Sequence, residues 1–166
     1  MAKAMEMIAR EGRGELSMEK LAEKVGIRKA SLYHHIRSRE DVIAESYAYH
    51  HRKMMKHGFS INLRDGKEKA LMLLYDNWMN IARDEKLECF LIAILSERYF
   101  FPEAREELRA LELMLEGSVG IIEGGKSEVT DVINAVFFSS LEKYLLTGED
   151  EGREIVSFLS THIISR

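Results

Sequence analysis

The chain has 166 residues, of which 46% are apolar, so it has room for one compact unit or two small ones and is not a disordered chain. A single Pro and the absence of alternating clusters of Val, Ile and Thr favour an all-α protein. The formal net charge of −4 argues, taken alone, against a nucleic-acid partner.

The charge is unevenly divided along the chain. Residues 1–57 hold 12 Lys or Arg and 8 Asp or Glu, a balance of +4, and five of the six His residues. Residues 58–166 hold 12 and 20, a balance of −8. A basic head joined to an acidic body is typical of a DNA-reading domain carried on a regulatory domain. A chance asymmetry is the alternative.

Residues 16–38 predict two short helices separated by one tight turn. Ser17 precedes a periodic run and can act as an N-cap, because its hydroxyl can accept an otherwise unpaired backbone N–H. Gly26 is expected to end the first helix, since glycine takes a positive φ at little cost. One buried stripe is expected from Leu21, Ala22 and Val25.

The second of these helices has an unusual outward face. Ile27 is expected to plug the space between the two helices, and Leu32 and Ile36 are expected to face inward. The outward positions carry donors that can bond phosphates or base edges: Arg28, Lys29, Ser31, Tyr33, His34 and His35. Because an α-helix fits the major groove of B-DNA, this layout predicts a DNA-reading helix-turn-helix. An ordinary helical hairpin with a solvated basic face is the alternative.

A third helix follows at once. Ser38 with Asp41 forms a capping-box pattern that opens it and fixes where Arg39 projects, at a helix N-terminus beside the DNA backbone. The helix can run from Glu40 to about Lys56 and link the head to the body. A continuous helix of this kind acts as a lever between domains.

The N-terminal portion, roughly residues 4–48, resembles the DNA-binding domain of the TetR family of transcriptional regulators. The elements that carry the resemblance are Gly12, Leu16-Ser17-Met18, Leu21-Ala22 with Gly26-Ile27, Ala30-Ser31-Leu32-Tyr33 with His35-Ile36, and Ser38-Arg39-Glu40-Asp41. It departs from the family in Ile36, where Phe is common, and in a short N-terminus without a basic arm. The resemblance implies a helix-turn-helix domain over residues 1–48 and an effector-binding and dimerisation domain over residues 49–166.

The same resemblance implies roles for individual residues. Base-edge contacts are expected from Arg28, Lys29, Ala30 and His34. Phosphate contacts are expected from Ser17, Ser31, Tyr33, His35 and Arg39.

The body is expected to be an antiparallel helical bundle. Helices are predicted over Lys67–Arg83, Leu87–Glu97, Pro102 to about Ile122, Ser127–Thr147 and Glu149–Ile164. The resemblance implies that the last two pair with their copies in a homodimer. These two helices look too apolar for a surface layer, although they could instead simply close the monomer core.

The body also offers candidates for a ligand cavity. Aromatic, Met and Ile side chains at helical spacing could line it: Tyr75, Trp78, Met79, Phe90, Ile94, Tyr99 and Phe100. The plain alternative is that they are ordinary core. A cavity of this composition favours a hydrophobic or aromatic effector over a sugar or a phosphate.

Other chemistry is weakly signalled. The chain has no phosphate-binding loop, nucleotide-binding Gly triplet or nucleophile elbow, so no cofactor or catalytic residue is predicted. The paired histidines are better explained as solvated or DNA-facing groups than as metal ligands, and Cys89 as a buried small hydrophobe. A secretory signal and an apolar run of membrane-spanning length are not visible, so a cytoplasmic protein without a membrane partner is expected.

The sequence therefore predicts a ligand-responsive transcription regulator, a repressor, which binds a pseudo-palindromic DNA operator as a homodimer and is released by a small hydrophobic effector. The first alternative is a helical ligand-binding or interaction module whose short N-terminus impairs DNA binding. The second is a small helical enzyme, which would need a convergent polar site in the body.

Overall fold

The computed structural model describes residues 1–59, 61–125 and 127–164, and within them all regular structure is helical, which confirms the all-α prediction. The elements, in chain order, are α1 (Ala2–Glu11), η1 (Arg13–Glu15), α2 (Met18–Val25), α3 (Lys29–Tyr33), α4 (Arg39–Met54), α5 (Lys67–Arg83), α6 (Glu85–Glu97), α7 (Pro102–Glu123), α8 (Glu128–Thr147), α9 (Gly152–Leu159) and η2 (Ser160–Ile164). Here η1 is a single 3₁₀ turn and η2 a π-helical turn.

The chain folds into two compact units. The first comprises Met1–Lys56 and Glu85–Glu107, and the second comprises His57–Asp84 and Leu108–Arg166. The packing units thus interleave along the sequence, because α6 and the start of α7 join the N-terminal helices. The expected boundary at residue 48 concerns function, and it stays a prediction.

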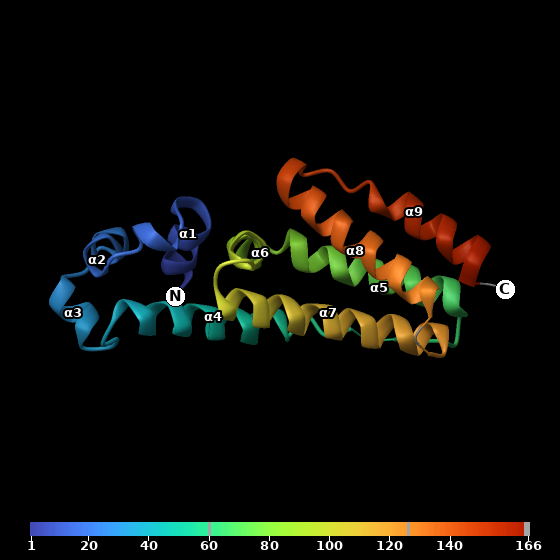
Figure 1. Cartoon of the computed structure of the whole chain (residues 1–166), viewed down its shortest axis with the longest axis horizontal. Helices are drawn as coiled ribbons and strands as arrows, with labels where there is room; N and C mark the ends of the chain where they lie inside the picture. The colour runs from blue at the N-terminus through green and yellow to red at the C-terminus, as the bar shows by residue number, and fades with distance from the viewer. Residues whose placement is uncertain (60, 126, 165–166) are drawn as a thin grey trace. The chain divides into compact units, whose positions relative to one another are not determined.

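In the first unit, α1 is the central element. Its buried residues are Ala4, Met5, Met7 and Ile8. The helix packs against α4 and α6 and also contacts η1 and α2, as the blue and yellow-green ribbons of Figure 1 show. Burying an apolar stripe of this size is what holds the N-terminal helices on α6.

The helix-turn-helix begins and ends where local signals place it. The Ser17 hydroxyl accepts the Lys20 backbone N–H at 3.1 Å, so this residue caps α2 as predicted. Gly26 ends α2 in the left-handed conformation with φ of 76°. The Ser38 hydroxyl accepts the Asp41 N–H at 3.0 Å and caps α4.

Two apolar predictions for this segment were wrong. Leu21 and Ala22 are buried, but Val25 is 47% exposed and Ile27 is 41% exposed. Neither closes the space between the helices, because no element of the described unit covers the end of α2. The second helix is also shorter than expected, since α3 ends at Tyr33.

The second unit is built around α5, which begins and ends as predicted. Figure 1 shows α5, α8 and α9 side by side, and all three pack on one another. Trp78 is fully buried, its indole N–H donates to the Phe137 carbonyl at 2.8 Å, and its ring packs against Phe138. The last helix begins at Gly152, three residues later than expected, after Gly148 ends α8 with φ of 77°.

Candidate nucleic-acid interface

Most side chains of the recognition segment, which lies between Gly26 and Ser38, are exposed to solvent. Leu32 is its one fully buried side chain, at 7% exposure, and Ile36 is half-buried. The side chains expected to read bases are all exposed: Arg28, Lys29, Ala30 and His34. This segment is therefore anchored mainly through Leu32, and most of its polar side chains are open to solvent.

Lys29 is exposed but paired. Its Nζ atom lies 2.5 Å from Oε1 of Glu19 on α2, and the two side chains are 46% and 75% exposed. Hydrogen bonding to Glu19 raises the pKa of the Lys29 ammonium, so this group carries its full charge at neutral pH. An exposed ion pair of this kind is weak enough for a phosphate or a guanine to replace.

The expected phosphate contacts fall into two structural classes. Ser31, Tyr33 and His35 are exposed, and Tyr33, at 45% exposure, closes α3. Ser17 is half-buried, and its hydroxyl already serves as the α2 cap. Its O–H hydrogen nevertheless remains available for a phosphate oxygen, because the cap uses only an oxygen lone pair.

Arg39 is the candidate that the structure holds most tightly. Its Nε–H donates to the Leu16 carbonyl at 2.7 Å, and its Nη2 donates to the Arg13 carbonyl. A weaker pair links Nη1 to Glu40 at 3.4 Å. The guanidinium therefore ties the first residue of α4 to the chain that precedes α2, and a phosphate would have to share it.

A buried polar cluster beneath the helix-turn-helix was not predicted. Arg13 is 9% exposed and pairs with Glu97 on α6 and with Glu103 at the start of α7. The Tyr47 hydroxyl donates to Glu97 at 2.8 Å. Arg13 and Glu97 are 84 positions apart in the sequence, so no local pattern indicated the cluster.

The predicted ligand residues do not gather in one place. Tyr75, Trp78 and Met79 are buried in the second unit, whereas Phe90 and Ile94 are buried in the first. Tyr99 and Phe100 are 73% and 76% exposed in the turn between α6 and α7. Their packing is that of ordinary core or surface, and their contact with an effector stays a prediction.

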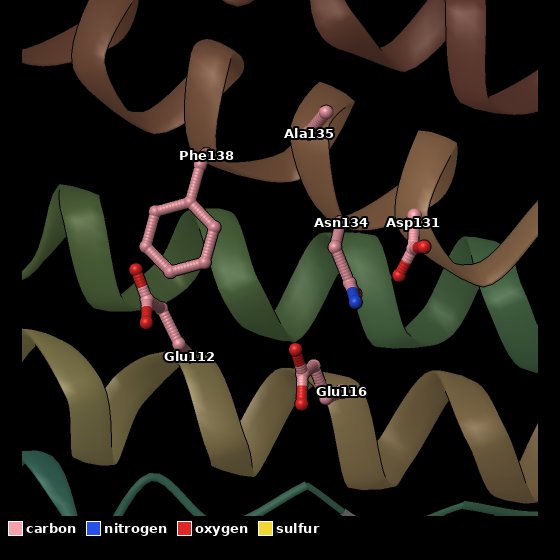
Figure 2. A pocket seen from close by; sticks show the side chains of 6 residues that line it. All are labelled: Glu112, Glu116, Asp131, Asn134, Ala135 and Phe138. Carbon is pink, nitrogen blue, oxygen red and sulfur yellow. The ribbon is translucent and has the colours of Figure 1, made fainter. Parts of the chain in front are cut away.

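A hollow of about 390 Å³ lies instead between α7 and α8, and sequence reasoning missed it (Figure 2). It is lined by Glu112, Glu116, Asp131, Asn134, Ala135 and Phe138. The side-chain oxygen of Asn134 is buried and makes no hydrogen bond. This lining is more acidic than the apolar cavity expected from the sequence. Glu112 and Glu116 are half-exposed and Asp131 is exposed, at helix positions that periodicity alone assigns to the surface.

Among residues 1–59, 61–125 and 127–164, His, Cys, Asp and Glu side chains form no group of three that could hold a metal ion. Within the same residues, none of the helices combines the length and the apolar character needed to cross a bilayer.

Comparison with known proteins confirms the resemblance of the N-terminal part. Residues 1–45 match the family described as bacterial regulatory proteins, tetR family. A TetR transcription regulator from Haloarcula marismortui shares the fold with a TM-score of 0.63 at 15% identity, over 99% of this chain and 96% of that one. The fatty acid degradation regulator FadR from Bacillus halodurans does so with a TM-score of 0.60 at 18% identity, over 97% and 92%. No curated protein matches the sequence.

Proposed function

We propose that this chain, whose residues 1–45 are a TetR-family DNA-binding domain and whose fold is that of a TetR transcription regulator, is a ligand-responsive regulator that binds an operator. The observation that carries the proposal is the exposed α3 helix, held between a Gly26 turn and a Ser38 cap. It offers Arg28, Lys29 and Tyr33 to solvent at the position where the family reads DNA.

In this proposal α3 enters the major groove. Base edges are contacted by Arg28, Lys29, Ala30 and His34, and phosphates by Ser17, Ser31, Tyr33, His35 and Arg39. A lysine bonds guanine O6 or N7, and a small Ala side chain leaves room for a thymine methyl group. Lys29 exchanges Glu19 for a base on binding, and breaking this exposed ion pair costs little.

The proposed assembly is a homodimer through α8 and α9. Val132, Ile155 and Phe158 are 50%, 50% and 59% exposed on these two helices, and the proposed dimer would bury them. A hollow of about 460 Å³ lies beside them, lined partly by Val136 and Lys143. A two-fold dimer presents two recognition helices to half-sites about 34 Å apart.

We further propose that the regulator is a repressor and that a small hydrophobic effector releases it. One solved structure of the same fold is a fatty acid degradation regulator, which fits an apolar effector. The effector must bind the DNA-incompetent conformation preferentially, because equal affinity for both conformations shifts nothing.

The test is selection of bound duplexes from a random DNA pool, followed by titration of the enriched sequence. We expect a palindrome with half-sites about one helical turn apart and an affinity that falls steeply with salt. Lys29→Ala should weaken binding to that operator by about 1–3 kcal/mol and relax selectivity at one base pair. The matched control is Lys69→Ala, an exposed lysine on α5.

Enrichment without a palindrome would reject the dimer. A folded protein that enriches no sequence would favour the interaction module over a DNA-binding regulator. Equal losses for Lys29→Ala and Lys69→Ala would reject α3 as the reading helix, since both remove one positive charge.

A further inference from the structure

A buried arginine joins the helix-turn-helix to the end of α6. In the first unit, the Arg13 Nε–H donates to Oε2 of Glu97 at 3.2 Å. Its Nη2 lies 3.1 Å from the same oxygen without the alignment of a hydrogen bond, and its Nη1 lies 3.3 Å from Glu103. The Arg13 and Glu97 side chains are 9% and 8% exposed. Water is therefore largely excluded from the pair.

Two aromatic residues complete the enclosure. The Phe101 ring lies across the Arg13 guanidinium, with 3.8 Å between Cζ and the ring centroid. The Tyr47 hydroxyl donates to Glu97, and burial together with this bond raises the pKa of Tyr47 above its ordinary range. Tyr47 is therefore neutral and acts as a donor throughout the physiological range. One oxygen of the Glu97 carboxylate, Oε2, thus accepts hydrogen bonds from both Arg13 and Tyr47.

The backbone of the same residue is held from the other side. The carbonyl of Arg13 accepts a hydrogen bond from Nη2 of Arg39, whose Nε–H donates to the Leu16 carbonyl. Arg39 is the first residue of α4 and follows the Ser38 cap, so it is fixed to the segment that leaves α3. Arg13 is therefore bound from two sides. The end of α6 binds its side chain through Glu97, and Arg39, which follows the recognition segment, binds its carbonyl.

We propose that Glu97, Arg13 and Arg39 form a positioning relay through which the C-terminal end of α6 fixes the orientation of residues 29–38, the larger part of the recognition segment. The relay itself is a property of the free chain. Its consequence for DNA affinity rests on the proposed function.

The chemistry of the cluster suits the orientation of the recognition segment better than the stabilisation of the packing between α1 and α6. A buried ion pair contributes little net stability, because the loss of hydration offsets most of the attraction. The apolar side chains of α1 already supply adhesion to α6, and apolar contact tolerates small sliding movements. A planar guanidinium with a carboxylate at its edge and a ring on its face tolerates neither rotation nor sliding.

The experiment uses the full chain and two substitutions that keep the shape of the cluster. Glu97→Gln removes the charge that faces Arg13, and Tyr47→Phe removes one hydrogen bond but keeps the ring edge packed on Phe90. Glu11→Gln is the matched control, because it makes the same chemical change in the exposed pair with Lys24. Amide hydrogen exchange is measured on free protein, and affinity for the selected operator is measured separately.

We expect exchange within residues 29–38 to rise by about tenfold in Glu97→Gln, the size of change that loss of one charged hydrogen bond produces, and by less in Tyr47→Phe. Exchange of the buried α1 amides should rise by a smaller factor, because neither substitution removes the apolar contacts that hold α1 on α6. Operator affinity should fall in the same order, and Glu11→Gln should match the wild-type protein in both measurements.

Unchanged exchange in residues 29–38 in both variants would overturn the relay. An equal rise in α1 and in residues 29–38 would also overturn it, because that result describes general loosening of the unit. If Glu97→Gln does not fold, Tyr47→Phe alone decides between these outcomes. A local rise in exchange, in a protein whose wild type binds no DNA, would keep the relay and reject the proposed function.

Discussion

Each compact unit contains a tyrosine hydroxyl and an arginine that share one carboxylate, but only the first unit buries the whole group. That group is Arg13, Tyr47 and Glu97, each at most 9% exposed. Its members come from η1, α4 and α6, so three separate elements meet at one carboxylate.

The group in the second unit is Tyr75, Arg83 and Asp150. The Tyr75 hydroxyl and the Arg83 guanidinium each donate to Asp150 at 2.5 Å, and the arginine side chain is 39% exposed. Burial of the Tyr75 ring, followed by the hydrogen bond to Asp150, raises the pKa of Tyr75 to about 12. The donors and acceptors are the same in kind as those of the first unit.

The difference between the groups lies in access to water. An exposed arginine that loses its carboxylate is hydrated at once, so the pair contributes little. A buried arginine that loses its carboxylate stays charged and unsolvated, so breaking the pair is costly even though forming it adds little. Contacts of the same kind should therefore respond very differently when the carboxylate is removed.

The largest expected effect comes from breaking the buried group. Glu97→Ala should lower the free energy of unfolding by about 3–5 kcal/mol, because Arg13 would remain buried without its main partner. Chemical denaturation at neutral pH measures this loss. A loss below about 1 kcal/mol would mean that water reaches Arg13, and the contrast between the two units would disappear.

The next effect concerns the packing around Tyr75. A Cβ atom added at Gly152 would lie 1.7 Å from the Ser140 hydroxyl oxygen and 2.5 Å from the Tyr75 hydroxyl oxygen. Gly152→Ala should therefore cost about 1–3 kcal/mol, since the start of α9 must move away from α5 and α8. Thermal unfolding measures the change. Gly117→Ala is the control within α7, where nothing lies within 4 Å, and it should stabilise the helix by about 0.5–1 kcal/mol.

The third effect is a loss of stability at low pH that comes from His50, a buried titratable group whose ring bonds a backbone carbonyl instead of a carboxylate. His50 on α4 is 2% exposed, stacks on Phe90, and its Nδ1–H donates to the Ser46 carbonyl at 2.7 Å. Burial lowers the pKa of His50, although the bond to Ser46 opposes the shift. The unfolded chain therefore binds a proton more readily than the folded one.

It follows that stability is fully present above the ordinary histidine pKa of about 6.5 and declines as the pH falls below it, towards the lowered value of the folded state. Denaturation across this range should show the decline in the wild-type protein and a flatter profile in His50→Gln, which keeps a donor for Ser46. Parallel profiles would assign the acid sensitivity to other groups.

The smallest effect is expected from the exposed group. Asp150→Asn should cost less than about 1 kcal/mol, because Arg83 remains hydrated and the amide oxygen can still accept from Tyr75. Most of this small effect should vanish at high salt. A loss as large as that of Glu97→Ala would show that burial does not explain the contrast.

Local signals made much of the fold predictable. Ser17, Gly26 and Ser38 act through neighbours within a few residues, so sequence alone locates the ends of α2 and the start of α4. The apolar period over Lys67–Arg83 gives both ends of α5. Periodicity identifies an apolar face but not whether another element covers it, which is why Val25 and Ile27 were wrongly expected to be buried.

The exposed residues of the candidate interface could be predicted from the sequence, but the buried contacts that hold them in place could not. Donors on α3 stand out because a surface helix rarely lacks carboxylates. The contact between Arg13 and Glu97 spans 84 residues and carries no local pattern. The hydrogen bonds from Arg39 to two backbone carbonyls could not be predicted either, because every residue type carries a backbone carbonyl.

The way in which the recognition segment is held determines how easily its sequence can be altered. The Gly26 turn and the Ser38 cap fix the ends of the segment, and Leu32 is its one fully buried side chain. Its exposed positions can therefore accept new side chains at little cost to folding. Evolution, or a designer exchanging these residues as a cassette, can explore new surface chemistry while the rest of the domain stays intact.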